Sequence, residues 1–325
     1  IILLIDIFDN SFKKSLTNFI SFDRAETLKQ SLKIFLLYSI ITLSIFIILN
    51  LLNIRSFNSL NLAMSIISSG GFIPTNDLSN ILLSNTQIVV FSFLLLTSFF
   101  SIFLSYNLIF NKNKNLNFYN EDIHLFFYFL FLLGIFFIFF NFDNNFTTLF
   151  LSLTSSVSNI GFSLNNNSSN LAFILLILVI IGGSFFSTSS GIRFLKIYSL
   201  FKYSINEILS YSRPKNVYVN KHLFSKDFFK LDEIYKYFLS IVIFVISLII
   251  LNTLLTLSGV NFEHSFKLSV LTLMNTVNSS MYGLEDFNFR DLHFFTKYYL
   301  ILFMIIGRVE LLTLLIICKK YLFKN

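Results

Sequence analysis

Three short polar stretches, each lying between two long apolar runs, constrain the fold of this chain more than any other feature. The first covers residues 66–77 and reads Ile-Ile-Ser-Ser-Gly-Gly-Phe-Ile-Pro-Thr-Asn-Asp. The second covers residues 155–163, with Gly161 followed by Phe162, and a weaker third covers residues 275–284. Each follows a short apolar segment, so the order of apolar run, short segment, turn and apolar run recurs as an internal repeat. A surface loop would explain one such stretch, but three at corresponding places predict a repeated architecture.

The long apolar runs predict an all-α polytopic membrane protein. The chain of 325 residues is 55% hydrophobic and only 13% charged, whereas a soluble domain carries about 25% charged residues. Crossing a bilayer takes about 20 apolar residues per helix. We expect spans at about 34–52, 86–110, 123–141, from 171 onward, 237–257 and 295–318.

The distribution of Lys and Arg predicts which side of the membrane the turns face. If the three turns share one side, nineteen basic residues fall in the segments on the other side and four on the turn side, with Arg308 inside a span. Basic residues accumulate in cytoplasmic loops. We therefore expect the turns to face outward. The net charge of +7 then reflects membrane orientation, and no nucleic-acid partner is expected.

The short segments at 57–67, 146–157 and 265–277 predict re-entrant helices around an ion path, because they are too short to cross a bilayer. A helix that ends inside the membrane points the partial negative charge of its C-terminus at the path. Backbone carbonyls beyond it can replace the hydration shell of a monovalent cation, and glycine lets them adopt unusual conformations. Tight extracellular turns without a ligand are the alternative.

Ten residues at 182–191, eight of them small or polar and with glycines at both ends, interrupt the span that begins near residue 171. A simple kink needs fewer, and discontinuous helices at mid-membrane commonly mark transport sites. Arg308 lies deep in the last span beside Glu310, where a charge is costly and usually functional. We predict that the interruption and Arg308 form an intramembrane gate. A structural ion pair of Arg308 with Glu310 or with another helix is the alternative.

These motifs resemble the superfamily of potassium transporters that contains TrkH, KtrB and the plant HKT proteins, with TrkH the most similar. The matching stretches, in the order of the chain, are Asp23–Thr27, Ser69–Phe72 with Pro74–Asn76, Asn159–Phe162, Ile181–Gly183 with Ser187–Thr188 and Gly191–Arg193, and Gly307–Glu310. The resemblance implies potassium uptake through a pore surrounded by four membrane-pore-membrane repeats. It also implies a multi-pass protein of the bacterial cytoplasmic (inner) membrane, a homodimer, and a cytosolic nucleotide-binding regulatory subunit of the TrkA or KtrA type.

On this resemblance the chain divides into four parts. Residues 1–30 would hold the end of a first-repeat helix and a cytoplasmic loop, and the chain is interpreted as a fragment truncated at its N-terminus. Residues 31–121 would form the second repeat. Residues 122–232 would form the third repeat, with the interrupted helix and a basic cytoplasmic segment, and residues 233–325 the fourth. The basic segment from Arg193 to Lys236 is a candidate docking surface for the cytosolic partner or for anionic lipid.

The resemblance also assigns candidate site residues. Those expected in the ion filter, whose backbone carbonyls would bind the transported potassium, are Ser69, Gly70, Gly71, Phe72, Asn159, Ile160, Gly161, Phe162, Tyr282 and Gly283. Those expected in the gate are Gly182, Gly183, Ser187, Thr188, Gly191 and Arg308. No cofactor other than the transported ion is expected.

The third turn departs from the family pattern, because Asn-Ser-Ser-Met-Tyr at 278–282 precedes Gly283. Either Gly283 is the filter glycine and the loop is longer, or Asn278 stands where glycine is expected. A sodium-permeable or weakly selective transporter of the same fold is therefore the alternative function, since part of the carbonyl cage is altered.

Other functional classes find little support in the sequence. We find no nucleophile motif, phosphate loop or carboxylate pair, and the four histidines show no metal-ligand spacing. We therefore do not predict an enzyme. A proton-coupled carrier would need acidic residues within spans, and Glu310 is the only candidate.

Overall fold

The computed structural model describes residues 24–75, 77–100, 119–140, 145–164, 169–184, 187–211, 231–277, 280–284, 287 and 289–309. The helices within them are α2 (Arg24–Leu51), α3 (Ser56–Ser68), α4 (Asn85–Phe99), α6 (Tyr119–Phe140), α7 (Phe146–Val157), α8 (Ser169–Ile180), α9 (Phe194–Ser210), α10 (Leu231–Leu257), α11 (Phe262–Leu273) and α12 (Phe294–Val309), with 3₁₀ turns η2 (Leu78–Asn80), η4 (Ser280–Tyr282) and η5 (Phe289–Asp291). In these residues the only β-type pairing is one isolated bridge between Ile181 and Ile192. The predicted all-α class is confirmed.

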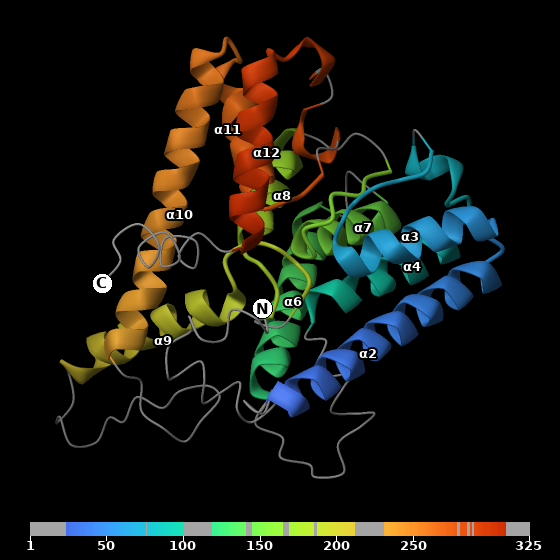
Figure 1. Ribbon diagram of the computed structural model, residues 1–325, viewed down its shortest axis with the longest axis horizontal. Coiled ribbons are helices and arrows are strands. Elements are labelled where there is room, and N and C mark those ends of the chain that lie inside the picture. Colours follow the sequence, from blue (N-terminus) through green and yellow to red (C-terminus); the bar gives the residue numbers. More distant parts are fainter. Residues whose placement is uncertain are drawn as a thin grey trace.

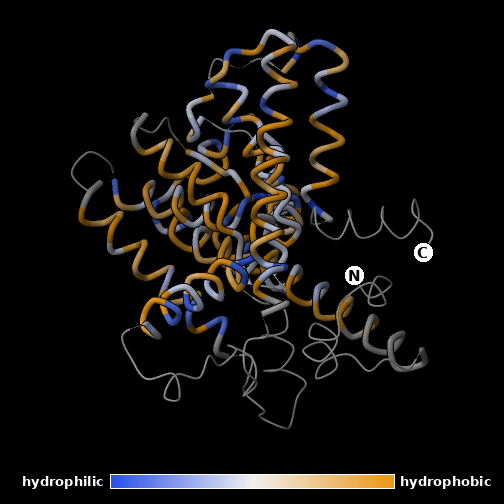
Figure 2. The backbone as a smooth tube through the Cα atoms, turned by 90° about the vertical axis from the view of Figure 1, so that its left-hand side faces the viewer, coloured by the Kyte–Doolittle hydropathy of each residue, from blue (hydrophilic) through white to orange (hydrophobic). Residues whose placement is uncertain are grey.

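Three of the described helices are long and apolar enough to cross a membrane. Their apolar stretches are Ile34–Leu51 in α2, Glu121–Ile138 in α6 and Ile234–Leu257 in α10. Each leaves most of its apolar side chains outside the protein core, and in α2 only 17% of the stretch is buried. Hydrophobic residues follow the helices along most of their length (Figure 2). Such outward apolar faces suit a lipid environment, in which only the polar backbone must be satisfied internally.

A long helix followed by a short helix and a turn occurs three times along the described chain. The pairs are α2 with α3, α6 with α7, and α10 with α11. The short members have 13, 12 and 12 residues, which at 1.5 Å per residue is about 18 Å and less than the roughly 30 Å of a bilayer core. Figure 1 shows α2–α4 on one side, α10–α12 on the other, and α6–α8 between them.

Two hydrophobic clusters form the core. One joins α6, α7 and α8 with α10, α11 and α12, and includes the fully buried Met281 and Tyr282. The other joins α2, α3 and α4 and also takes in Ile160 and Phe162, which follow α7. The turn after α7 therefore lies where the two halves of the protein meet.

Two helix ends differ from the predicted spans. The span expected over 86–110 begins as α4, but the helix ends at Phe99, because Phe100 is extended with φ −81° and ψ 163°. The short helix expected over 265–277 ends at Leu273, because Asn275 takes a left-handed conformation with φ 51°. Residues 1–23, 101–118, 185–186, 212–230, 278–279 and 310–325 lie outside the described residues. The expected first-repeat helix, the later parts of the spans expected over 86–110 and 295–318, part of the interruption, most of the basic segment and Glu310 fall there.

Candidate functional site

The three short helices end in the same kind of cap. Each is followed by a non-glycine residue with a left-handed backbone, namely Ser69 (φ 50°), Asn159 (φ 58°) and Asn275 (φ 51°). The next residue then donates its N–H to the carbonyl five residues earlier, from Gly70 to Ser65 at 2.8 Å, from Ile160 to Ser155 at 3.0 Å and from Thr276 to Leu271 at 3.0 Å. A left-handed residue with this hydrogen bond is a common way to end a helix. The three turns are therefore equivalent, and their positions can be matched residue by residue.

Matching the caps pairs Gly71 and Gly161 with Val277. Both glycines have a positive φ, 69° and 91° respectively. Val277 does not share this conformation, because a β-branched side chain strongly disfavours it. The structural counterpart of Gly71 and Gly161 in the third turn is thus Val277, a position that sequence reasoning missed. The sequence signal for this position is Asn-Thr-Val at 275–277. Its alignment with the other two turns is clear only once Asn275 is known to have a left-handed backbone.

The three turns pack directly on one another. A Cβ atom on Gly71 would lie 2.2 Å from the Ile160 carbonyl oxygen and 2.5 Å from Cγ2 of Val277. A Cβ atom on Gly161 would lie 2.4 Å from the Val277 carbonyl oxygen. The Val277 N–H donates to the Ile160 carbonyl at 3.4 Å. We call the place where Gly71, Ile160, Gly161 and Val277 meet the turn junction.

Six of the ten predicted filter residues lie in the turns of this junction. Two more, Phe72 and Phe162, come directly after these turns. Ser69, Gly70, Gly71, Asn159, Ile160 and Gly161 form two of its turns. Phe162 is fully buried and packs against Phe91, with ring centroids 5.5 Å apart and the rings tilted by 39°. Phe72 is 76% exposed.

The contacts of Tyr282 and Gly283 go to α7, α8 and α11. The Tyr282 side chain is fully buried, and its hydroxyl lies 3.4 Å from Oγ of Ser156 in α7. Gly283 does have a positive φ of 70°, but a Cβ atom there would face Nζ of Lys267 and Cβ of Ala172. By its place after the cap, the position in the third turn that is equivalent to Gly71 and Gly161 is Val277, which is neither of the two positions, Gly283 and Asn278, that the sequence offered.

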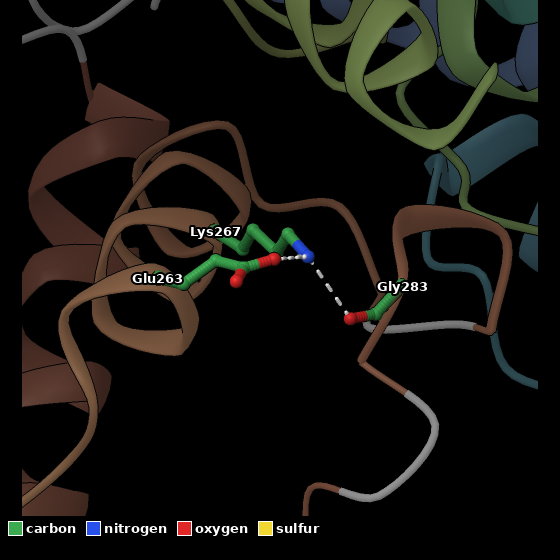
Figure 3. Close-up of polar contacts among 3 residues, drawn as sticks. All are labelled: Glu263, Lys267 and Gly283. Carbon is green, nitrogen blue, oxygen red and sulfur yellow. Dashed lines mark hydrogen bonds and ion pairs between the residues drawn. The ribbon is translucent and has the colours of Figure 1, made fainter. Parts of the chain in front are cut away.

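Lys267 of α11 holds the Gly283 turn from the side (Figure 3). Its Nζ donates to Oε1 of Glu263 at 2.5 Å and to the Gly283 carbonyl at 3.2 Å. The hydrogen bond from Lys267 and its positive charge keep the pKa of the exposed Glu263 carboxyl below its usual value. The ammonium group of Lys267 is therefore the hydrogen-bond donor to both Oε1 of Glu263 and the Gly283 carbonyl oxygen.

The interruption between α8 and α9 is a loop whose two ends are hydrogen-bonded to each other. The Gly182 N–H donates to the Ile192 carbonyl at 2.9 Å, and the Ile192 N–H donates to the Ile180 carbonyl at 3.1 Å. A Cβ atom on Gly182 would lie 2.2 Å from the Ser190 carbonyl, and one on Gly191 would lie 2.9 Å from Cα of Gly182. The two glycines therefore let the ends of the loop touch backbone to backbone.

The loop docks on the C-terminal end of α4. The N–H groups of Ser184 and Ser189 donate to the carbonyls of Phe99 and Ser98 at 3.0 and 3.1 Å. The Thr188 hydroxyl also donates to the Ser98 carbonyl, at 3.4 Å. The last carbonyls of a helix have no partner within it. The loop supplies those partners, which is consistent with α4 ending earlier than the sequence predicts.

Arg308 connects this loop to the first turn. Its Nη1 donates to Oγ of Ser190 at 2.8 Å, and its Nη2 donates to the Ser68 carbonyl at 2.9 Å. Oγ of Ser69 donates to Oγ1 of Thr188 at 3.3 Å. Residues that the sequence assigned to filter and gate, more than 100 positions apart, are therefore in direct contact.

Gly307 sets the position of Arg308. A Cβ atom at Gly307 would lie 2.1 Å from the Leu273 carbonyl at the end of α11. One turn away, Nδ2 of Asn275 donates to the Met304 carbonyl at 3.0 Å. Because α12 can approach the end of α11 this closely, the arginine that follows Gly307 reaches both the loop and α3.

The comparison with solved structures identifies the fold. The potassium transporter TrkH from Vibrio parahaemolyticus matches with a TM-score of 0.81 at 18% sequence identity, over 98% of this chain and 68% of that one. The chain has the TrkH fold. No protein-family model matches the sequence, and no curated protein matches it either. The resemblance inferred from the short motifs is thus confirmed for the fold.

Within the TrkH fold, the described residues offer backbone oxygens rather than metal-binding side chains. They contain no group of three or more His, Cys, Asp or Glu that could hold a metal ion. The polar groups of the turn junction and the loop include backbone carbonyls and N–H groups, serine and threonine hydroxyls, the amide of Asn159, and the guanidinium groups of Arg193 and Arg308. Carbonyl and hydroxyl oxygens suit a weakly held monovalent cation.

Proposed function

We propose that this protein takes up potassium ions across the bacterial cytoplasmic membrane, with the turn junction as the ion filter and the 182–191 loop as the gate. The observation that carries the proposal is the convergence of three equivalently capped short helices on one junction. Each directs the partial negative charge of its C-terminus toward that junction. Carbonyls held there by glycines with positive φ are the groups that replace the hydration shell of a cation. The TrkH fold supports the same assignment.

The gate assignment is supported by the contacts between loop and filter. The loop reaches Ser69 through Thr188 and is held to Ser68 by Arg308. A fixed positive charge at this point opposes a cation, and the loop fills the space beside the turn. The native assembly proposed with it is a homodimer whose turns face outward. A cytosolic nucleotide-binding subunit would bind at the basic segment that follows the loop.

Flux through proteoliposomes tests this function. Vesicles that carry the purified native protein should take up K⁺ faster than protein-free vesicles, and Gly71→Asp and Gly161→Asp should abolish the uptake, because both side chains would enter space that backbone atoms occupy. Gly134→Ala is a matched control, since a Cβ atom at Gly134 meets nothing within 4 Å. Equal K⁺ flux with and without protein would refute the proposal, as would unchanged flux in both aspartate variants.

A sodium-permeable or weakly selective transporter is a second candidate, and Val277 favours it. The third turn lacks the glycine conformation of the other two, and its N–H donates to the Ile160 carbonyl instead of leaving that oxygen to a cation. Selectivity depends on the number and arrangement of coordinating carbonyls. The native protein should therefore admit Na⁺ appreciably, and Val277→Gly should raise the ratio of K⁺ to Na⁺ flux. Strong rejection of Na⁺ by the native protein would exclude this candidate.

A further inference from the structure

Arg193 contacts the interrupting loop at several points. It lies directly after the loop and is the N-terminal capping residue of α9, with φ −51° and ψ 132°. Its Nη1 lies within hydrogen-bond distance of four oxygens, which are the Ser189 carbonyl at 2.9 Å, Oγ of Ser187 at 3.2 Å, the Ser187 carbonyl at 3.3 Å and the Ser184 carbonyl at 3.3 Å. The charge pattern placed Arg193 at the start of a basic cytoplasmic segment. In the structure its side chain points into the loop instead.

These contacts explain how the loop keeps its shape. Three loop carbonyls point toward one place, and carbonyl dipoles so arranged repel one another unless a donor lies between them. A guanidinium group offers five N–H donors in a rigid plane and stays charged. The serine hydroxyls complete the arrangement, because Oγ of Ser189 accepts from the Gly183 N–H at 2.9 Å and lies 2.8 Å from Oγ of Ser187.

We propose that Arg193 is the positioning residue that holds the described parts of the loop, residues 182–184 and 187–191, folded beside the turn junction and couples their order to α9. The role differs from that of Arg308, which joins Ser190 of the loop to Ser68 of α3. It rests on the proposed function in one respect, that an ordered loop restricts ion flow.

The coupling follows from the way α9 begins. The Phe194 N–H, in the first turn of α9, donates to the Gly183 carbonyl at 3.1 Å. Backbone and side chain at the start of α9 therefore both bind the loop. Figure 1 shows α9 running away from the loop and crossing α10. A partner that displaces α9 would withdraw the guanidinium and loosen the loop in one movement.

Lys202 provides a matched control. It carries the same charge and lies in the same helix, nine residues after Arg193, which is about 13 Å along the helix axis. It lies within electrostatic range of His124 in α6. Removing its charge alters the basic character of α9 without removing a donor from the loop.

Thiol labelling of the loop tests the proposal without relying on transport. The only cysteine, Cys318, is replaced by serine, and Thr188→Cys places a probe on the loop beside Ser69. A membrane-impermeant thiol reagent then reports how often the loop opens, because labelling tracks the open population. Arg193→Gln should raise the labelling rate at least about tenfold, since hydrogen bonds to a charged group are lost. Arg193→Lys should recover part of the protection, and Lys202→Gln should label at the parent rate.

Basal K⁺ flux of the same variants in proteoliposomes completes the test. Arg193→Gln should conduct several-fold faster than its parent, and Lys202→Gln should not. If Arg193→Gln does not yield folded protein, Ser187→Ala, which removes one hydroxyl partner, should give an intermediate rise in labelling. Labelling at the parent rate in folded Arg193→Gln, or in Ser187→Ala if that replaces it, would overturn the proposal. Absence of K⁺ flux in every protein would instead refute the proposed function, and labelling would still decide the role of Arg193.

Discussion

Replacing Gly161 by alanine should disable the turn junction while leaving the rest of the fold intact. The new Cβ atom would lie 2.4 Å from the Val277 carbonyl oxygen and 3.1 Å from the Val277 nitrogen. It must move by about 1 Å to reach an ordinary contact, and its neighbours are backbone atoms that cannot rotate away. The residue would also have to keep a φ of 91°.

The expected cost follows from these two effects. A left-handed conformation costs an alanine about 1–2 kcal/mol, and an extra methyl group in a packed site costs about 1–3 kcal/mol. The native turn is thus destabilised by about 2–5 kcal/mol relative to a shifted one. At about 1.4 kcal/mol per factor of ten, even the lower value leaves roughly 30-fold fewer molecules with the native turn.

Proteoliposome K⁺ flux, normalised to folded protein recovered by size-exclusion chromatography, is the assay. Gly161→Ala should lower the flux at least about 30-fold, whereas Gly134→Ala in α6 should leave it unchanged, because nothing lies within 4 Å of its Cβ position. Gly161→Ala protein that folds and conducts at the native rate would refute the reasoning. The turn junction would then be a structural contact away from the ion path.

Three further predictions follow from other contacts. Arg308→Ala removes the hydrogen bonds to Ser190 and Ser68 and should raise K⁺ flux about tenfold; folded variant protein that conducts no faster than the parent would show that the arginine is structural. Gly307→Ala would place a Cβ atom 2.1 Å from the Leu273 carbonyl and should destabilise the protein by about 1–3 kcal/mol, seen as a lower midpoint of thermal unfolding; an unchanged midpoint would deny the close approach of α11 and α12. Because Lys267 keeps the pKa of the Glu263 carboxyl below its usual value, the ion pair stabilises the fold above the usual Glu range and is lost as the pH falls through the lowered pKa. Glu263→Gln should therefore lower the unfolding midpoint slightly at neutral pH and not in strong acid, and an equal effect at both values would show that the charge is irrelevant.

The helices were largely predictable, because they depend on local composition. Runs of apolar residues long enough for a bilayer gave the positions of α2, α6 and α10, and the re-entrant segment expected at 146–157 matches α7 to the residue. Helix ends that depend on distant partners were not predictable. The carbonyls at the end of α4 accept hydrogen bonds from the N–H groups of residues 184 and 189. The sequence near the end of α4 does not indicate that contact.

The candidate site shows the same division. Gly71 and Gly161 were visible because glycine is the residue that tolerates a positive φ. Val277 was not visible, because its equivalence to them comes from the cap at Asn275 and the hydrogen bond from Thr276 to Leu271. Tyr282 and Gly283 were assigned to the filter by the presence of a glycine, and the contacts that the structure gives them, with Ser156 and Lys267, depend on packing that the sequence does not show.

The amino-acid sequence by itself determined that the chain forms membrane-length helices joined by short helices and glycine turns, because hydrophobic length and backbone freedom are local properties. Only the tertiary structure decided which turns meet, that Val277 completes the junction, and that Arg193 and Arg308 donate to different oxygens of one loop. The reason is that hydrogen bonds and close backbone contacts join residues more than 100 positions apart, such as Arg308 with Ser190 and Ser68. Such pairings are set by how the helices pack, and the order of residues along the chain does not contain them.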